Sequence, residues 1–139
     1  MSLATTIRVR YQETDAMGVV YYGNYLSWFE VARTEYMRHL GHTYAQLEVE
    51  GFFLPVIEAS CRYKKPAHYD DELALYALLS VDGLRFHFAY EVRRVDNGEL
   101  LAAGVTEHLC VNREGKIDRA ASKRLASLVQ CESSCPSCS

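Results

Sequence analysis

The feature that most constrains the fold is one long helical pattern, roughly residues 25–40, which the rest of a short chain has to bury. Its apolar side chains recur at spacings of three and four, the period of an amphipathic helix. They are Leu26, Phe29, Tyr36, Met37 and Leu40, with Tyr25, Trp28 and Ala32 widening the face. Gly41 then provides a natural stop. So broad an apolar surface predicts a helix buried on most sides, as if a sheet wrapped around it.

Strand patterns account for most of the remaining chain. Apolar and polar residues alternate, or apolar residues run on continuously, over short segments bounded by turn formers. These predicted strands are 7–11, 55–65, 73–81, 85–93 and 100–111. Asp82-Gly83 and Asn97-Gly98 are strong hairpin signals, so the last three strands are expected to be antiparallel neighbours.

The order of these elements predicts an α+β domain, in which a five-stranded antiparallel sheet wraps around one long central helix. A short helix is expected at 43–50 and a terminal amphipathic helix at 122–130. A chain of 139 residues suits one core, so residues 1–130 are taken as a single domain. Residues 131–139 form a Cys- and Ser-rich tail that we expect to be disordered.

Composition excludes several classes of protein. A formal net charge of −3 without a basic face argues against nucleic-acid binding. No apolar stretch approaches the ~20 residues that span a bilayer, and the first residues lack the pattern of a secretory signal. Five cysteines are an odd number, and Cys61 and Cys110 fall within strands, which suits reduced thiols in a cytoplasmic protein. No metal site is predicted, because the histidines lack ligand spacing and the thiols of Cys131, Cys135 and Cys138 lie in the tail.

Asp15 is the candidate for chemistry, because it lies in a glycine-containing loop that delivers the chain to the long helix. A helix start exposes unpaired backbone N–H groups and a partial positive charge, which can stabilise an oxyanion. A carboxylate held nearby can act as a general base towards water or attack directly as a nucleophile. The competing interpretation is structural, since an Asp in such a loop is more often a turn or capping residue.

A family resemblance favours the catalytic interpretation. Residues 11–25, which read YQETDAMGVVYYGNY, resemble the signature of the 4-hydroxybenzoyl-CoA thioesterase family, and most of all its branch of acyl-CoA thioesterases linked with the Tol–Pal system. Further likeness lies at 30–35, 54–58, 63–67 and 69–73. The resemblance spans about residues 5–112, in register with the predicted order of elements.

The resemblance implies a hotdog fold, with subunits that pair through their sheets and active sites at the dimer interface. It implies a homodimer or homotetramer that hydrolyses acyl-CoA without a metal or other cofactor, coenzyme A being part of the substrate. Asp15 matches the catalytic aspartate of the family. The backbone amides of Tyr22 and Gly23 then polarise the thioester carbonyl, and Asn24 is a first-turn or capping residue. Gly23 departs from the branch, many members of which carry a His at that position.

Other residues are candidates for binding substrate. Lys64, Lys65 and Arg85 are expected to meet the phosphates of coenzyme A, although solvated residues on a sheet face are the commoner reading for each. His68 is a candidate for the mouth of the site, and Trp28 for the wall of the acyl tunnel. The sequence does not distinguish a coenzyme A donor from an acyl-carrier-protein donor.

Two other functions have to be considered. Hydratases on the same fold resemble each other in pairing an Asp with a His five residues later, whereas Val20 stands five residues after Asp15. A non-catalytic protein that binds acyl-CoA or acyl carrier protein is the remaining alternative. In such a protein Asp15 would affect no rate.

Overall fold

The structure is a computed structural model that describes residues 1–133 and, within them, the side chains of residues 1–130. Its sheet consists of the strands β1 (Ser2–Arg8), β2 (Val56–Tyr63), β3 (Glu72–Asp82), β4 (Arg85–Arg94) and β5 (Leu100–Leu109). All neighbouring pairs are antiparallel, and the order across the sheet is β1-β3-β4-β5-β2. The predicted α+β class and five-stranded sheet are therefore confirmed.

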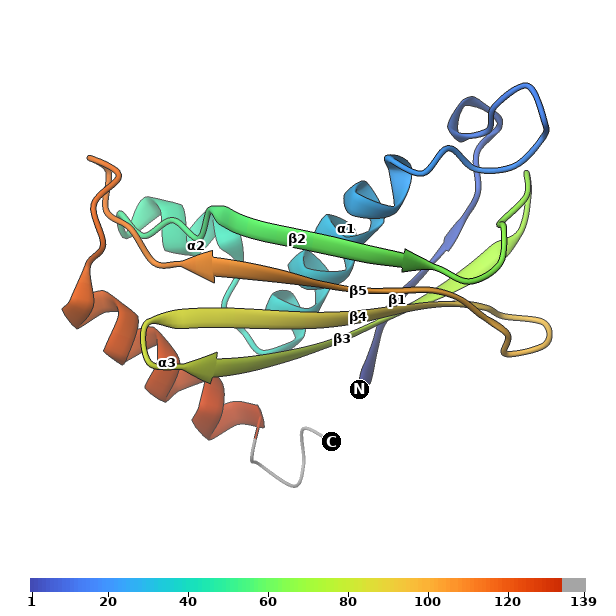
Figure 1. The fold of residues 1–139 in the computed structure, drawn as a ribbon. Coiled ribbons are helices and arrows are strands. Elements are labelled where there is room, and N and C mark those ends of the chain that lie inside the picture. Colours follow the sequence, from blue (N-terminus) through green and yellow to red (C-terminus); the bar gives the residue numbers. More distant parts are fainter. Residues whose placement is uncertain (134–139) are drawn as a thin grey trace.

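Helix α1 (Asn24–His39) lies across one face of this sheet and contacts β1, β2, β3 and β4 (Figure 1). A short helix, α2 (Tyr44–Val49), follows it, and α3 (Arg119–Ser133) lies at the opposite end of the sheet from the start of α1, where it contacts β3 (Figure 1). No helix within residues 1–133 has the length and apolar character needed to cross a membrane.

Helix α1 is buried along one side only. The side chains that it buries are Tyr25, Trp28, Phe29, Ala32, Tyr36 and Met37. Leu26 and Val31, by contrast, are 45% and 39% exposed. The expectation of burial on most sides, which included Leu26, is thus wrong for a single chain, because one sheet can cover only one side of a helix.

The contact between α1 and the sheet depends on a glycine. The ring of Phe29 stacks on that of Tyr90 in β4, with 4.4 Å between centroids and 5° between planes. A Cβ atom on Gly104, in the neighbouring strand β5, would lie 2.4 Å from the Phe29 ring and 2.6 Å from the backbone oxygen of Ser60. Gly104 therefore allows the helix to approach the sheet this closely.

The first strand differs from its prediction. β1 ends at Arg8, and the chain turns into a 3₁₀ helix, η1 (Tyr11–Glu13). Tyr11 is 76% exposed, whereas Val9, which was expected to share its face, is buried. The alternation ends because residues 11–13 turn the chain away from β3, the partner of β1.

The end of the chain also differs from its prediction. α3 begins three residues before the expected start, and the carboxylate of Asp118 accepts a hydrogen bond of 2.9 Å from the amide of Ala121 in its first turn. The helix continues to Ser133, so the first residues assigned to the tail are helical. The prediction of disorder for the rest of the tail falls on residues 134–139, which lie outside the described part of the chain.

We expect Gly104→Ala to lower the free energy of unfolding by about 3 kcal/mol, because the added methyl group must displace the Phe29 ring or the backbone of Ser60. Chemical denaturation measures the change. Val105→Ala, at the adjacent half-buried position, is the control and should cost about 1 kcal/mol or less. Equal stability of Gly104→Ala and the native protein would contradict this close packing of helix on sheet.

Candidate active site

The loop between β1 and α1 closes on the side chain of Asp15. Its Oδ1 atom accepts hydrogen bonds from the amides of Met17, at 2.8 Å, and Val19, at 3.4 Å. The Asp15 amide donates to the Val19 carbonyl at 2.8 Å. Gly18 adopts a φ of +78°, a backbone conformation that would be strained in a residue with a side chain. The loop is therefore a tight turn built around one carboxylate.

This geometry is compatible with both interpretations of Asp15, as a turn residue and as a catalytic carboxylate. The residue is a turn former, as the structural reading expects. Its Oδ1 atom accepts hydrogen bonds from two amides of its own loop. However, Asp15 is exposed, and its Oδ2 atom accepts no hydrogen bond from any residue in the described chain. One oxygen is thus fixed and the other is available.

The start of α1 has free backbone donors. Its N-cap position, Gly23, makes no side-chain capping bond. The amides of Asn24 and Tyr25 donate to the carbonyls of Tyr21 and Tyr22, at 3.0 and 3.2 Å. The amides of Tyr22 and Gly23 find no acceptor among the residues that the structure describes. Helix starts with such orphan donors attract negative charge.

The orientation of these two free amides is determined by the carbonyls bonded to them. In a planar trans peptide the C=O and N–H groups point in opposite directions. The Tyr21 carbonyl is held by the Asn24 amide, so the Tyr22 N–H points the other way. The Tyr22 carbonyl likewise accepts from the Tyr25 amide, and also from the hydroxyl of Tyr63 at 3.1 Å. The peptide between Tyr22 and Gly23 is therefore oriented by Tyr63, a side chain of β2, and its N–H group points away from that hydroxyl.

Tyr63 is well suited to hold this peptide. Partial desolvation and the neighbouring Cys61 raise the pKa of Tyr63 to about 12, so the phenol remains protonated and can donate although the side chain is 44% exposed. Its ring lies 4.7 Å from the ring of Tyr22 and 5.1 Å from that of Tyr25, centroid to centroid. No local sequence pattern had indicated a role for this residue.

Glu13 connects the Asp15 loop to the helix. Its side chain is only 7% exposed, and its carboxylate accepts from the Arg10 amide at 2.8 Å and the Trp28 indole at 2.9 Å. Its backbone carbonyl accepts from the Tyr21 amide and from the side-chain amide of Asn24, at 3.0 and 2.8 Å. Asn24 is therefore a first-turn residue that faces the loop and does not cap the helix.

The carboxylate of Glu13 is ionised in this setting. Burial alone would raise its pKa, but hydrogen bonds from the Arg10 amide and from Trp28 outweigh burial and lower the pKa below the ordinary value. Its role could not be read from the sequence, because its burial depends on Trp28, fifteen residues further along the chain.

A hollow of about 320 Å³ opens beside the helix start. It is lined by Val19, Val20, Tyr22, Tyr25, Tyr63, Lys64, Lys65 and Pro66. Three of the predicted site residues therefore share one hollow, and Tyr63 contributes to its wall. Aromatic and aliphatic walls with a few polar groups are typical of ligand sites.

The two predicted lysines that line this hollow differ in their partners. Lys65 forms an ion pair with Glu99 at 2.9 Å, whereas Lys64 forms none with any residue of the described chain. His68 is exposed, its backbone pairs with Val19 of the Asp15 loop, and its amide donates to Asp71 at 2.8 Å. The loop before β3 thus supports the Asp15 loop.

Arg85 and Trp28 do not join the others. Arg85 is the first residue of β4, and this end of β4 lies away from the loop between β1 and α1 (Figure 1). Its guanidinium pairs with Glu107 at 2.8 Å, so within one chain it lies apart from the other predicted phosphate contacts. Trp28 is buried and donates to Glu13, which is a role in packing.

Among the described side chains, no group of three or more His, Cys, Asp or Glu is arranged to hold a metal ion. The thiols of Cys131, Cys135 and Cys138, which have ligand-like spacing, lie outside the described side chains.

A helix laid on a five-stranded antiparallel sheet in this order is the hotdog fold. Residues 9–128 match the thioesterase-like superfamily, and the chain belongs to that family. The class of enzyme expected from the sequence is thereby confirmed.

Individual relatives agree with this assignment. The chain is 38% identical to YneP of Bacillus subtilis (strain 168) over 109 residues, 78% of each protein. It is 37% identical over 108 residues to a Haemophilus influenzae protein named acyl-CoA thioesterase YbgC, covering 76% of this chain and 78% of that one. Among solved structures, a DHNA-CoA thioesterase from Staphylococcus aureus superposes with a TM-score of 0.80 at 33% identity, covering 94% of both chains.

We expect Glu13→Gln to lower the free energy of unfolding by about 1–3 kcal/mol, because an amide must oppose one of the two N–H donors that the carboxylate satisfies. Since the folded-state pKa is depressed, the stabilisation is present above the ordinary value of 4.5 and is lost as pH falls through the folded pKa. Urea denaturation at about pH 3 and about pH 6 measures this; wild type should gain more stability over that range than the variant.

The matched control is Glu114→Gln, at an exposed turn. It should follow the wild-type pH profile. The same profile in Glu13→Gln and wild type would show that the Glu13 carboxylate does not stabilise the loop.

Proposed function

We propose that this chain hydrolyses acyl-CoA thioesters to a free carboxylic acid and coenzyme A, with Asp15 as the catalytic carboxylate. One observation carries the proposal: the Asp15 loop and the free amides of Tyr22 and Gly23 are joined through Glu13 at the start of α1. The name of the Haemophilus influenzae relative, acyl-CoA thioesterase, supports this choice of substrate.

The reaction would proceed with the thioester carbonyl directed at the helix start. The amides of Tyr22 and Gly23 would donate to the oxyanion that forms as the carbonyl is attacked. The free Oδ2 of Asp15 would either take a proton from the attacking water or itself attack the carbonyl to form a mixed anhydride. In either route water supplies the hydroxyl group of the acid, and the thiol of coenzyme A leaves.

Binding of the substrate would use the hollow beside the helix start. Lys64 has no ion-pair partner among the described residues and is the better of the two lysines for a phosphate, since Lys65 is engaged by Glu99. The rings of Tyr22, Tyr25 and Tyr63 provide an apolar wall for the arm that carries the thioester. An acyl carrier protein presents the same arm and is the other possible donor.

The motif at residues 11–25 supports the branch linked with the Tol–Pal system, with one departure. A Cβ atom on Gly23 would lie 2.9 Å from the ring of Tyr21, so that ring occupies the space of a side chain at this position. In place of the His of that branch, the site has a glycine covered by an aromatic ring. We therefore expect its acyl preference to differ from that of the His-containing members.

Pairing of two subunits is also part of the proposal. β2 is an edge strand that pairs only with β5 within the described chain, and seven of its eight residues are exposed. Val56, Ile57 and Tyr63 are among the exposed apolar residues. An edge of this kind is suited to pairing with a second copy, in a homodimer or a homotetramer.

The test of the mechanism is Asp15→Asn in a thiol-release assay over a panel of acyl-CoA substrates. Asn keeps the Oδ1 acceptor for Met17 and Val19, so the loop should persist while the charge is lost. We expect kcat to fall by a factor of about 10² or more, with little change in KM. Asp96→Asn, in an exposed hairpin, is the control and should keep wild-type rates.

The outcome also separates the two functions. Equal rates for Asp15→Asn and wild type would refute the role of Asp15, leaving it as a turn residue. Background rates for both proteins on every substrate, together with measurable binding of acyl-CoA, would favour the non-catalytic binding protein.

The role of Tyr63 is tested by Tyr63→Phe, which removes the hydroxyl that donates to the Tyr22 carbonyl. We expect kcat to fall by a factor of about 3–10 with KM nearly unchanged, because a looser peptide presents the Gly23 amide less well. Tyr69→Phe, at an exposed tyrosine, is the matched control. A change in KM alone would instead indicate that Tyr63 only lines the hollow.

A further inference from the structure

The loop between β2 and β3 is fastened to the Asp15 loop by its backbone. The amide of Val20 donates to the carbonyl of Ala67 at 2.9 Å, and Val19 and His68 form an antiparallel bridge. The carbonyl of Val19 accepts from the Asp15 amide at 2.8 Å, and its amide donates to the Asp15 carboxylate at 3.4 Å. The position of Asp15 therefore depends on that of the β2–β3 loop.

An arginine of the sheet holds the β2–β3 loop. Arg94 is the last residue of β4, in which Tyr90 and Val92 are buried. Because side chains alternate between the two faces of a strand, that of Arg94 lies on the face where Tyr90 stacks against α1. Its guanidinium pairs with the carboxylate of Asp71 and donates to the carbonyl of Pro66 at 3.2 Å. Arg94 thus bonds the loop at two points.

The carboxylate of Asp71 connects Arg94 to the residue that bridges to the Asp15 loop. Its Oδ2 atom accepts from the Arg94 guanidinium and from the amide of His68, the latter at 2.8 Å. The side chains of Arg94 and Asp71 are only 16% and 21% exposed. An ion pair sheltered in this way is screened less by water and salt than an exposed one. The pair therefore constrains His68, and through it Val19.

A second arginine bonds the same segment from the outside. Arg8 donates to the carbonyl of Asp70 at 2.8 Å and pairs with Glu72 at 3.0 Å, but its side chain is 55% exposed. Exposed ion pairs contribute little, because water competes for both charges. Arg94 is therefore the arginine on which the conformation of the loop is expected to depend.

The β2–β3 loop needs such a constraint because its backbone is strained. Asp70 has a φ of +70°, in the left-handed region that few residues with a side chain adopt, and no other non-glycine residue of the described chain has a positive φ. A strained conformation persists only where its surroundings hold it. Without Arg94 the loop is expected to relax, and its bonds to Val19 and Val20 are expected to open.

We propose that Arg94 is a positioning residue of the active site, which holds the β2–β3 loop through Asp71 and thereby orients Asp15. The inference rests on the proposed function, in which Asp15 is the catalytic carboxylate. A reacting group displaced by about 1 Å loses much of its rate. The expected signature is a fall in kcat that exceeds any change in KM.

Hydrogen exchange of the Val20 amide, followed by NMR on the full chain, tests whether Arg94 holds the loop. Arg94→Met should speed this exchange about tenfold or more, because the bond to Ala67 opens with the loop. The single variant leaves the Asp71 charge unpaired, which should also lower the stability of the whole fold. In Arg94→Met/Asp71→Asn both charges are gone and an Asn oxygen still accepts from His68. There the Val20 exchange should remain about tenfold faster than in wild type, while that of Tyr90 in β4 changes less than about twofold.

Thiol release tests whether the constraint acts on the reaction, with the substrate of the acyl-CoA panel that wild type hydrolyses fastest. The kcat of Arg94→Met/Asp71→Asn should fall about tenfold, while KM changes less than about threefold. Arg94→Lys, whose ammonium group can still pair with Asp71, should keep kcat within about threefold of wild type.

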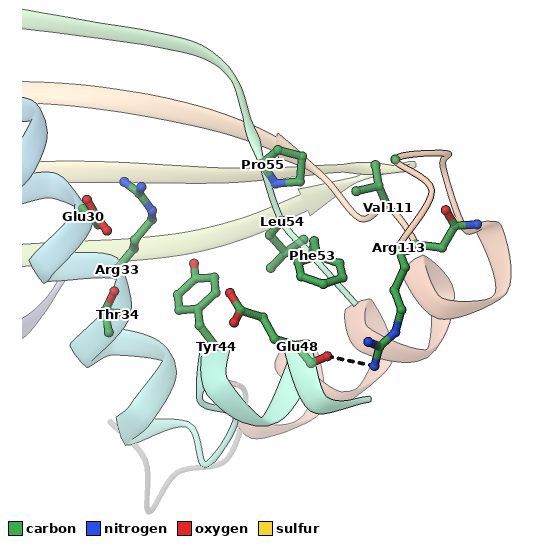
Figure 2. A pocket seen from close by; sticks show the side chains of 12 residues that line it. Glu30, Arg33, Thr34, Tyr44, Glu48, Phe53, Leu54, Pro55, Val111 and Arg113 are labelled. Carbon is green, nitrogen blue, oxygen red and sulfur yellow. Dashed lines mark hydrogen bonds between the residues drawn. The ribbon is translucent and has the colours of Figure 1, made fainter. Parts of the chain in front are cut away.

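Two other arginines provide matched controls. Arg8→Met removes the exposed arginine of the same segment and should change the measured amide exchange and kcat less than about twofold. Arg113→Met removes a guanidinium that donates to the backbone carbonyls of Glu48 and Val49, at 3.4 and 3.2 Å, at the end of α2 (Figure 2). It should leave the amide exchange of the Asp15 loop unchanged. Equal acceleration by either control and by Arg94→Met would overturn the proposal, since it would indicate a general effect of losing an arginine.

The remaining outcomes separate this inference from the proposed function. Unchanged exchange at Val20 in both Arg94 variants would overturn the inference, whether or not the chain hydrolyses acyl-CoA. Fast exchange with a wild-type kcat, or with a rise in KM alone, would also overturn it, because the pair would then only shape the wall of the hollow. If Asp15→Asn keeps the wild-type rate, or wild type hydrolyses no substrate of the panel, the proposed function fails. The exchange rates then show by themselves whether Arg94 holds the Asp15 loop.

Discussion

The close approach of α1 to the sheet is the constraint on which the rest of the structure depends. Gly104 leaves no Cβ between the helix and β5, and Phe29 stacks on Tyr90 in the space that results. This contact sets the distance of the helix from β2, and hence the reach of Tyr63 to the first peptides of α1. The helix start is therefore placed by packing in the core, about one and a half turns away.

At the helix start, hydrogen bonds to two backbone carbonyls fix the direction of the N–H groups in the same peptides. Bonds to the carbonyls of Tyr21 and Tyr22 orient two planar peptides, whose N–H groups then lack acceptors in the described chain. Glu13 connects the same region to the Asp15 loop through its backbone carbonyl and its buried carboxylate. Organisation of this kind suits a site that stabilises charge, because dipoles fixed in advance need not reorganise during the reaction.

The start of α1 leaves backbone amides without acceptors among the described residues. The Asp15 loop precedes them in the chain, and one oxygen of its carboxylate accepts no hydrogen bond from the described residues. Polar groups of this kind cost stability where they are shielded and not satisfied, so the helix start is a natural place for a ligand.

The order of the elements, the antiparallel pairing of the last three strands and the position of Asp15 before a helix could be predicted from the sequence, because periodicity and turn residues are local signals. The motif at residues 11–25 also identified the family. Three features could be seen only in the folded chain: α1 is covered on one side, Arg85 pairs with Glu107 away from the lysines, and Glu13 and Tyr63 bond to residues of the first turns of α1 and the peptide before it. These features join residues distant in the chain, and such contacts depend on how the helix packs on the sheet, which no local pattern encodes.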